Sequence, residues 1–357
     1  MIHSVIRRLK QAIQFTLGLF GYRLVRLPKK PPVISYSDWD LFGIEPSGNA
    51  AKGRPLPLDI AGLRLNTSAS TAVTVIKEQK RKQDGGSVVR LQHQYRRDLK
   101  LDQPAVRIIG GEWLKNIGQI AHLDTYFKLK ALGMLEPSET IICLDGLTPA
   151  NKSLLSYYAP FASRIVPDRT SLGELAEFVE LFEEPTLTVR LTDGRTGNYH
   201  GLFYDVAEAW RQQGRPPLIS LRPAHRATGR KWLASLGLPD DGWFATFHCR
   251  TNCDHQDLRS VRPETYTSAM EAVIRAGGWV VCMGTPKLVD ARPKIINRAD
   301  HRTPGDDWKD VFLLADCWFF VGCTSGPADV ANAFDVPSII TNTVQIGSQA
   351  THNHDLF

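Results

Sequence analysis

The stretch "WFFVGCTSGPADVANAF", residues 318–334, decides the fold of this chain. Its apolar start is typical of a buried strand, and the residues after Gly326 have the spacing of an amphipathic helix. Between them the chain turns through Cys323, Thr324 and Ser325. A sharp turn from a buried strand into a helix is the basic element of a parallel sheet, so this stretch predicts the α/β class.

Strand and helix patterns alternate on both sides of this stretch. A first series starts near residue 104 with the strand pattern "AVRIIG" and the helix pattern "IAHLDTYFKLKALGM". A second series starts at residue 243 with the strand pattern "WFATFHC". Strands that alternate with helices form parallel sheets, so we expect two Rossmann-like units in tandem that face each other across a cleft.

These patterns divide the chain into four parts. Residues 1–27 are expected to form a basic amphipathic helix, and residues 28–103 an irregular connector with a helix. Residues 104–238 are expected to form the first Rossmann-like unit, which takes the acceptor, and residues 239–357 the second, which takes the nucleotide. The polar segment 190–229 has no period that assigns its structure.

Composition indicates a globular protein. The chain of 357 residues has 43% hydrophobic and 22% charged residues and a net charge of +6. Most of the excess positive charge lies in the first hundred residues, so we expect no nucleic-acid partner for the α/β units. The six cysteines lie mostly in or beside apolar runs, which favours reduced thiols in a cytoplasmic protein.

The basic N-terminal segment suggests two alternatives. The uncharged run at residues 11–22 is too short to span a bilayer, and no small-residue cleavage site follows it. A helix over residues 1–27 can lie in the headgroup layer of the inner membrane face. It can equally pack on the surface of the protein itself.

The turn at residues 323–326 is a candidate phosphate site. Small residues let a phosphate approach the backbone at a helix start, and the hydroxyls of Thr324 and Ser325 can add donors. The alternative is an ordinary serine cap of the helix. A capping serine does not need Gly322 and Gly326 on either side, so we favour the phosphate site.

The strand end "FHCRTNC", residues 247–253, is a second candidate. Alternation places His248 and Arg250 on one face, where they can hold a diphosphate. A metal site is the alternative, because Cys249, Cys253, Asp254 and His255 are close in sequence. Alternation sends Cys249 to the other face, and Cys-x-x-x-Cys is not a usual zinc spacing, so we predict no metal.

Two further corners complete the predicted site. Gly284 and Thr285 follow the strand pattern "WVVCMG". In the first unit, Asn116 and Gly118 lie in a glycine-rich loop before a helix that carries His122 and Asp124. His122 can instead be a half-buried structural histidine. The chain holds neither G-x-G-x-x-G nor G-x-x-x-x-G-K-[ST], which disfavours dinucleotide oxidoreductases and P-loop enzymes.

The blocks "NIGQIAHLDTYF", "FHCR", "GGWVVCMG" and "WKDVFLLADCWFFVGCTSGPADVANAFDVPSIITN" together resemble a family of bacterial GT-B glycosyltransferases associated with surface polysaccharides. The resemblance covers about residues 105–345. The His-x-Arg strand end is also similar to that of fucosyltransferase-like GT-B enzymes, in which the arginine, here Arg250, binds the diphosphate. Thr285 departs from the family, which has an acidic residue there, and so does the helix start at residues 118–122. Members usually continue past the last strand, so we expect a chain incomplete at Phe357.

The resemblance implies a metal-independent, inverting glycosyltransferase that needs no cofactor. Such an enzyme moves a sugar from a nucleotide diphosphate-sugar to a glycan or lipid-linked acceptor. Arg250 is then catalytic, with His122, Asp124 or Asp254 as the base. The residues expected to bind the nucleotide-sugar are Asn116, Gly118, His248, Arg259, Gly284, Thr285, Thr324, Ser325 and Gly326. A nucleotide-sugar epimerase of the same fold and a non-catalytic nucleotide-sugar- or glycan-binding module are the alternatives.

Overall fold

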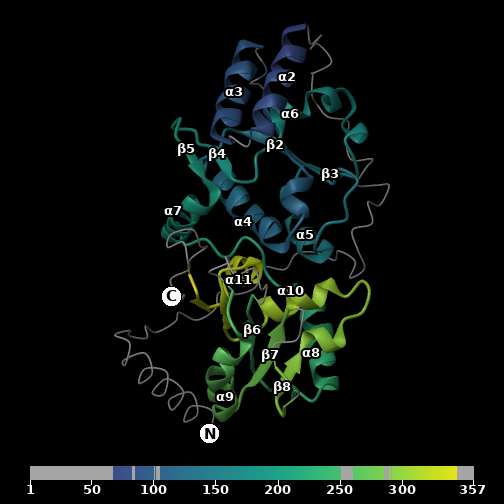
Figure 1. The fold of residues 1–357 in the computed structure, drawn as a ribbon, viewed down its shortest axis with the longest axis vertical. Helices are drawn as coiled ribbons and strands as arrows, with labels where there is room; N and C mark the ends of the chain where they lie inside the picture. Colours follow the sequence, from purple (N-terminus) through teal and green to yellow (C-terminus); the bar gives the residue numbers. More distant parts are fainter. Residues whose placement is uncertain are drawn as a thin grey trace.

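A computed structural model of the chain describes residues 67–82, 85–99, 101, 105–250, 260–284, 289–290 and 292–343. The expected helix at residues 1–27 and the connector up to residue 66 lie outside these residues, as do three predicted site residues. These three are Asp254, Arg259 and Thr285. The described chain forms two α/β units that follow each other along the long axis of the molecule (Figure 1).

The first unit is built on a three-stranded parallel sheet of order β1-β2-β3. Its apolar strand residues are buried, because helices cover the sheet. The strands are β1 (Ala105–Ile109), β2 (Ser138–Cys143) and β3 (Arg164–Val166). The helices between them are α4 (Ile117–Ala131), α5 (Lys152–Tyr158) and the short 3₁₀ segments Gly111–Leu114 and Ala159–Phe161.

The second unit is built on a five-stranded parallel sheet of order β10-β9-β6-β7-β8. The strands are β6 (Phe244–His248), β7 (Trp279–Met283), β8 (Ile295–Asn297), β9 (Phe320–Cys323) and β10 (Ser338–Thr341). The helices are α9 (Thr267–Arg275), α10 (Asp307–Ala315), α11 (Gly326–Ala333) and the 3₁₀ segments Pro263–Tyr266 and Arg298–His301. From β6 the chain first builds one side of the sheet and then returns to the other, so the strand order reverses between β6 and β9.

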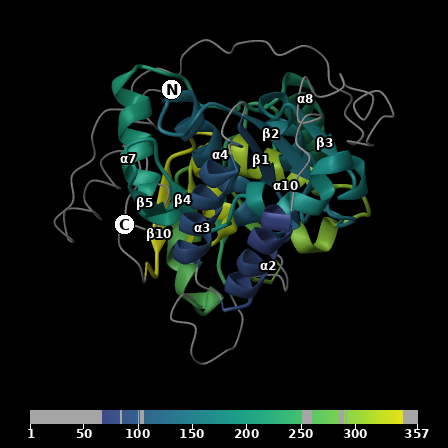
Figure 2. The ribbon, with the colours of Figure 1, turned by 90° about the horizontal axis from the view of Figure 1, so that it is seen from above.

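The remaining elements extend the first unit and link it to the second. They are α2 (Thr67–Arg81), α3 (Gly85–Asp98), α6 (Val179–Phe182), the antiparallel pair β4 (Thr188–Arg190) and β5 (Thr196–Asn198), α7 (Tyr199–Gln212), α8 (Pro223–Ser235) and the 3₁₀ segment Thr170–Phe178. Helices α7 and α8 lie on opposite sides of the molecule in both views (Figures 1 and 2). The polar segment 190–229, which the sequence pattern does not assign, thus contains strand β5 of the hairpin, helix α7 and the start of helix α8.

Helix α8 comes before the expected boundary at residue 238 but packs against the second sheet. The ring of Phe312 on α10 fills the space beside Gly229, where a Cβ would come within 2.4 Å of it. Arg226 and Arg230 both bond to the carboxylate of Asp316, at 2.9 and 2.7 Å. In packing terms, α8 is therefore part of the second unit.

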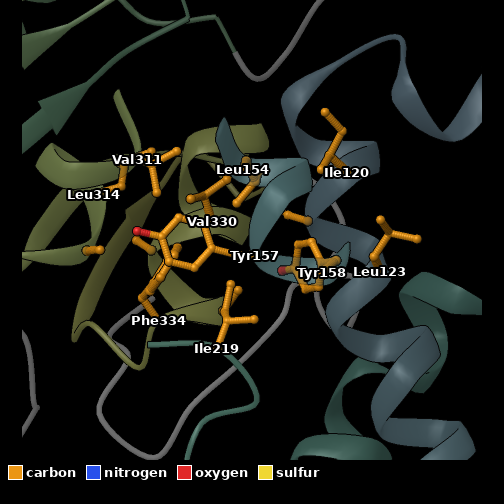
Figure 3. Close-up of a cluster of buried hydrophobic side chains, with 14 of the residues drawn as sticks. Ile120, Leu123, Leu154, Tyr157, Tyr158, Ile219, Val311, Leu314, Val330 and Phe334 are labelled. Carbon is orange, nitrogen blue, oxygen red and sulfur yellow. The ribbon is translucent and has the colours of Figure 1, made fainter. Parts of the chain in front are cut away.

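The two units share a continuous apolar core (Figure 3). Tyr157 of α5 lies edge-on to Phe334, with ring centroids 5.2 Å apart. Leu154 of α5 and Val330 of α11 are fully buried in the same cluster. The cleft expected between the units is thus filled by side chains at this point, and a ligand can reach only the rim of the contact.

The structure confirms the α/β class with parallel sheets that the sequence predicts. The sequence predicts strands at residues 243–249 and 318–322. The ends of β6 and β9 differ from these predicted ends by no more than two residues. Within the described part of the chain, no helix is both long enough and apolar enough to cross a membrane.

Candidate active site at the strand-order reversal

The predicted residues of the second unit meet at the carboxyl ends of β6 and β9. His248 ends β6 and pairs in register with Gly322 of β9. A side chain at Gly322 would come within 2.6 Å of the His248 carbonyl oxygen, so the strands can lie this close only with glycine there. Ligands of open α/β sheets bind at the point where the strand order reverses, and this is that point.

Ser325 is bonded to His248 instead of capping its own helix. Its Oγ lies 3.1 Å from Nδ1 of His248 and also donates to the Cys323 carbonyl oxygen at 3.1 Å. Ser325 occupies the N-cap position of α11, yet its side chain makes no capping bond. The ordinary serine cap that the sequence left as an alternative is therefore absent.

Thr324 and Arg250 flank this pair. Oγ1 of Thr324 is buried and has no hydrogen-bond partner among the described residues. The backbone N–H of Arg250 donates to Sγ of Cys323 at 3.2 Å, which holds the end of β6 against the end of β9. Burial, together with the positive charge of Arg250, lowers the pKa of His248 to about 4. His248 is therefore neutral at pH 7 and acts through hydrogen bonds.

Gly284 lies beside the histidine ring. Its φ of +112° lies in the region that favours glycine. A Cβ at this position would lie 3.6 Å from Cδ2 of His248, in ordinary contact. The structure thus brings together Gly284, His248, Arg250 and the turn at residues 324–326, as the sequence predicts for a common edge.

The first unit reaches this edge through Gly118. A Cβ on Gly118 would come within 2.9 Å of Cα of Gly326, and a Cβ on Gly326 within 2.6 Å of the Gly118 nitrogen. The starts of α4 and α11 therefore touch backbone to backbone. Asn116 caps α4, because its Oδ1 accepts from the backbone N–H of Gln119 at 2.8 Å.

His122 lies in the core of the first unit, although it is predicted as a base. Its side chain is 5% exposed, and its ring packs against those of His200 and Phe203 on α7, at 4.7 and 5.2 Å. Burial lowers the pKa of His122 to about 3, and the neighbouring His200 lowers it further. A group that holds its proton so weakly is a poor proton acceptor at neutral pH.

Asp124 is also buried, two turns from the start of α4. Its carboxylate is 2.5 Å from Nζ of Lys128, four residues on, and its pKa is raised by burial, against the opposing effect of Lys128. Lys128 in turn lies over the ring of Trp210, at 5.7 Å. Asp124 therefore forms a buried ion pair with Lys128.

Asp329 is a residue of this edge that the sequence pattern does not single out. It lies in the first turn of α11, and a Cβ on Gly118 would come within 3.3 Å of its Oδ2. An acidic residue in a first helical turn is common, since it complements the helix dipole, so the sequence gives no sign of its position. Only the approach of the two units places it at the junction.

The described residues hold no group of three or more histidine, cysteine, aspartate or glutamate side chains arranged to share a metal ion. Cys249, Cys282 and Cys323 are buried free thiols whose pKa values are raised by burial. Raised thiol pKa values favour the neutral form, which is a poor nucleophile and a poor metal ligand.

No protein-family model matches the sequence, and no curated protein is similar to it. Several solved structures are similar in fold. The glycosyl transferase family 9 structure from Veillonella parvula DSM 2008 is 13% identical, with a TM-score of 0.45 over 71% of this chain and 86% of that one. The E. coli ADP-heptose LPS heptosyltransferase II is 15% identical, with a TM-score of 0.41 over 66% and 84% of the two chains.

A UDP-GlcNAc 2-epimerase from Methanocaldococcus jannaschii is also similar, at 10% identity and a TM-score of 0.26 over 72% of this chain and 65% of that one. None of these three is a fucosyltransferase, so they give no support to the fucosyltransferase-like resemblance of the His248-x-Arg250 strand end. At these identities the chemistry has to be derived from the residues of the chain itself.

Proposed function

We propose that the protein is a glycosyltransferase that moves a sugar from a nucleotide diphosphate-sugar to a glycan or lipid-linked acceptor in cell-surface polysaccharide synthesis. One observation carries the proposal: the Ser325 hydroxyl points to His248, which leaves the start of α11 without a side-chain cap. An uncapped helix start at the reversal of strand order is suited to an anion.

The diphosphate would lie between the start of α11 and Arg250. The Thr324 hydroxyl, which has no partner among the described residues, and the backbone N–H of Gly326 would supply donors, and the guanidinium of Arg250 would supply positive charge. As the bond to the sugar breaks, negative charge grows on the diphosphate. These fixed donors stabilise that charge without rearrangement.

Other parts of the proposal rest on the sequence. It stays a prediction that the enzyme needs no cofactor and no metal and that the transfer inverts the anomeric configuration. A cytoplasmic location at the inner membrane face also stays a prediction. So does membrane contact through residues 1–27, which lie outside the described residues. Arg259 and Thr285 likewise stay predicted nucleotide-sugar ligands.

A panel of nucleotide diphosphate-sugars tests the proposal, with binding followed by calorimetry and turnover by release of the nucleoside diphosphate. The panel includes ADP-heptose and UDP-GlcNAc. Arg250→Ala should weaken binding of the preferred donor by about 10- to 100-fold, because a bond to a charged group is lost. Arg275→Ala, which removes an exposed arginine of α9, is the matched control and should leave binding unchanged.

Three outcomes would contradict the proposal. Equal donor binding by the protein and its Arg250→Ala variant would remove the assigned diphosphate site. Conversion of the donor to its epimer would indicate the epimerase, and binding without turnover on any acceptor would indicate a non-catalytic module.

A further inference from the structure

We propose that Asp329 is the catalytic base of the transfer, the group that takes the proton of the acceptor hydroxyl. This inference rests on the proposed function. It places the base on the second unit, at the junction with the first, whereas the sequence pattern points to the helix of His122 and Asp124.

The position of Asp329 is fixed from two sides. Its own helix holds it one turn from Ser325, and its backbone N–H donates to the Ser325 carbonyl oxygen at 3.4 Å. From the other unit, the start of α4 lies directly against it, because Oδ2 would be 3.3 Å from a Cβ at Gly118. A carboxylate at this point lies between the diphosphate site and the first unit, where an acceptor would approach.

The surroundings of Asp329 leave its carboxylate available. It forms no ion pair or hydrogen bond with a side chain among the described residues, and it is partly exposed. The titratable group beside it is the Tyr158 phenol on α5, whose pKa responds to the charges of both Asp124 and Asp329. Asp124 is bonded to Lys128 through Oδ2, and its Oδ1 is enclosed in the core without a partner, while Nδ1 of His248 is bonded to Ser325. Asp329 is therefore the partly exposed carboxylate at this edge.

Protonation of Asp329 suits this role. Burial raises the pKa of Asp329 to about 8, so the carboxyl is close to balance between its two forms near neutral pH. Burial also raises the pKa of Tyr158 well above its ordinary value, and the charges of Asp124 and Asp329 add to that shift. A general base is most effective when its pKa lies near the working pH.

The step is balanced in atoms and charge. The acceptor oxygen forms a bond to the anomeric carbon while the bond from that carbon to the diphosphate oxygen breaks, and its electron pair stays on the diphosphate. The hydroxyl proton passes to the Asp329 carboxylate and then to water. Asp329 ends the cycle ionised again.

Asp329→Asn tests the role, and Asp241→Asn, which changes an exposed residue near the opposite end of β6, is the matched control. With the preferred donor and acceptor, Asp329→Asn should lower kcat by about 100-fold or more, while the donor Kd stays within threefold. The kcat of the parent protein should rise with pH up to about 8 and then level off, and this rise should be lost in the variant. Asp329→Glu should recover part of kcat.

The inference is overturned if Asp329→Asn keeps more than a third of kcat, or if its donor Kd rises as much as its kcat falls. A second measurement needs no donor: the infrared difference between the parent protein and Asp329→Asn should contain a protonated-carboxyl band at pH 7 that disappears above about pH 9. Absence of that band at pH 7 also overturns the inference. Failure of the proposed function is distinct, because then the parent protein itself binds no nucleotide diphosphate-sugar.

Discussion

Helices α4 and α11 begin in contact with each other, yet their starts are built differently. The start of α4 is closed by Asn116, whose side chain accepts from the backbone of its own first turn. The start of α11 has a serine in the same position, but that serine is bonded to His248. The first arrangement caps the helix with its own side chain. In the second, Ala328 and Asp329 donate their backbone N–H groups to the Ser325 carbonyl oxygen and Pro327 has none, so the N–H of Gly326 is the first-turn donor left for a ligand.

Buried histidines lie on both sides of this junction, and acid has the largest expected effect on them. His122 on α4 and His225 on α8 are 5% and 2% exposed, and burial lowers their pKa values to about 3 and about 4. Unfolded histidines titrate near 6.5, so the unfolded chain binds more protons below that pH. The contribution of each of these two histidines to stability should therefore fall by about 2 kcal/mol between pH 7 and pH 5, and Asp329, with its raised pKa, should act in the opposite direction.

Urea unfolding at pH 7 and pH 5 measures this loss. His122→Gln should reduce the pH-dependent part by about 2 kcal/mol, because glutamine does not titrate. An unchanged dependence in the variant would mean that His122 is not buried in its neutral form. A diphosphate ligand should raise the pKa of His248, at the open helix start, and leave that of His122 unchanged.

The contact between the two helices is tested by Gly326→Ala. Its Cβ would lie 2.6 Å from the Gly118 nitrogen and 2.8 Å from Cγ2 of Ile117, so the helices must move apart. Thermal unfolding should report a loss of about 1–3 kcal/mol. The control is Gly201→Ala on α7, where the Cβ meets nothing within 4 Å and alanine should stabilise the helix by up to about 1 kcal/mol. Equal stability of the two variants would contradict the close contact.

Exchange of each N-cap residue for alanine is the most direct comparison and has the smallest effect. Asn116→Ala should cost about 1 kcal/mol of stability through loss of the cap. Because the Asn116 side chain is used by its own helix, this variant should weaken donor binding less than Ser325→Ala does. Ser325→Ala should change stability by less than about 0.5 kcal/mol but weaken donor binding by about 5- to 10-fold. The reverse pattern, with binding lost in Asn116→Ala alone, would move the anion site to α4.

The sequence predicts the strands well because apolar runs bounded by turn residues mark them. It also predicts that Gly284, His248 and the turn after β9 share one edge, because parallel strands end on the same side. Helix α7 has a signal that the prediction does not use, because Tyr199, Leu202, Phe203, Val206 and Trp210 recur at helical spacing and are all buried.

Two features of the site depend on tertiary contacts and have no local signal. The bond from Ser325 to His248 follows from the register of β6 with β9, which brings residues far apart in the chain into contact. The position of Asp329 follows from the approach of α4 to α11. Likewise, the sequence favours His122 as a site residue. In the structure, His200 and Phe203 of α7 pack against its ring and bury it, which no local pattern indicates.

The apolar junction of Tyr157, Val330 and Phe334 also limits how the molecule can move. A hinge motion that separated the two units would bring these side chains into water, at about 25 cal/mol for every Å² exposed. Wide opening is thus a rare event. If the protein is the proposed transferase, its substrates would enter and its products leave with the two units joined, and a variant that loosens this junction would change the rate of exchange at its rim.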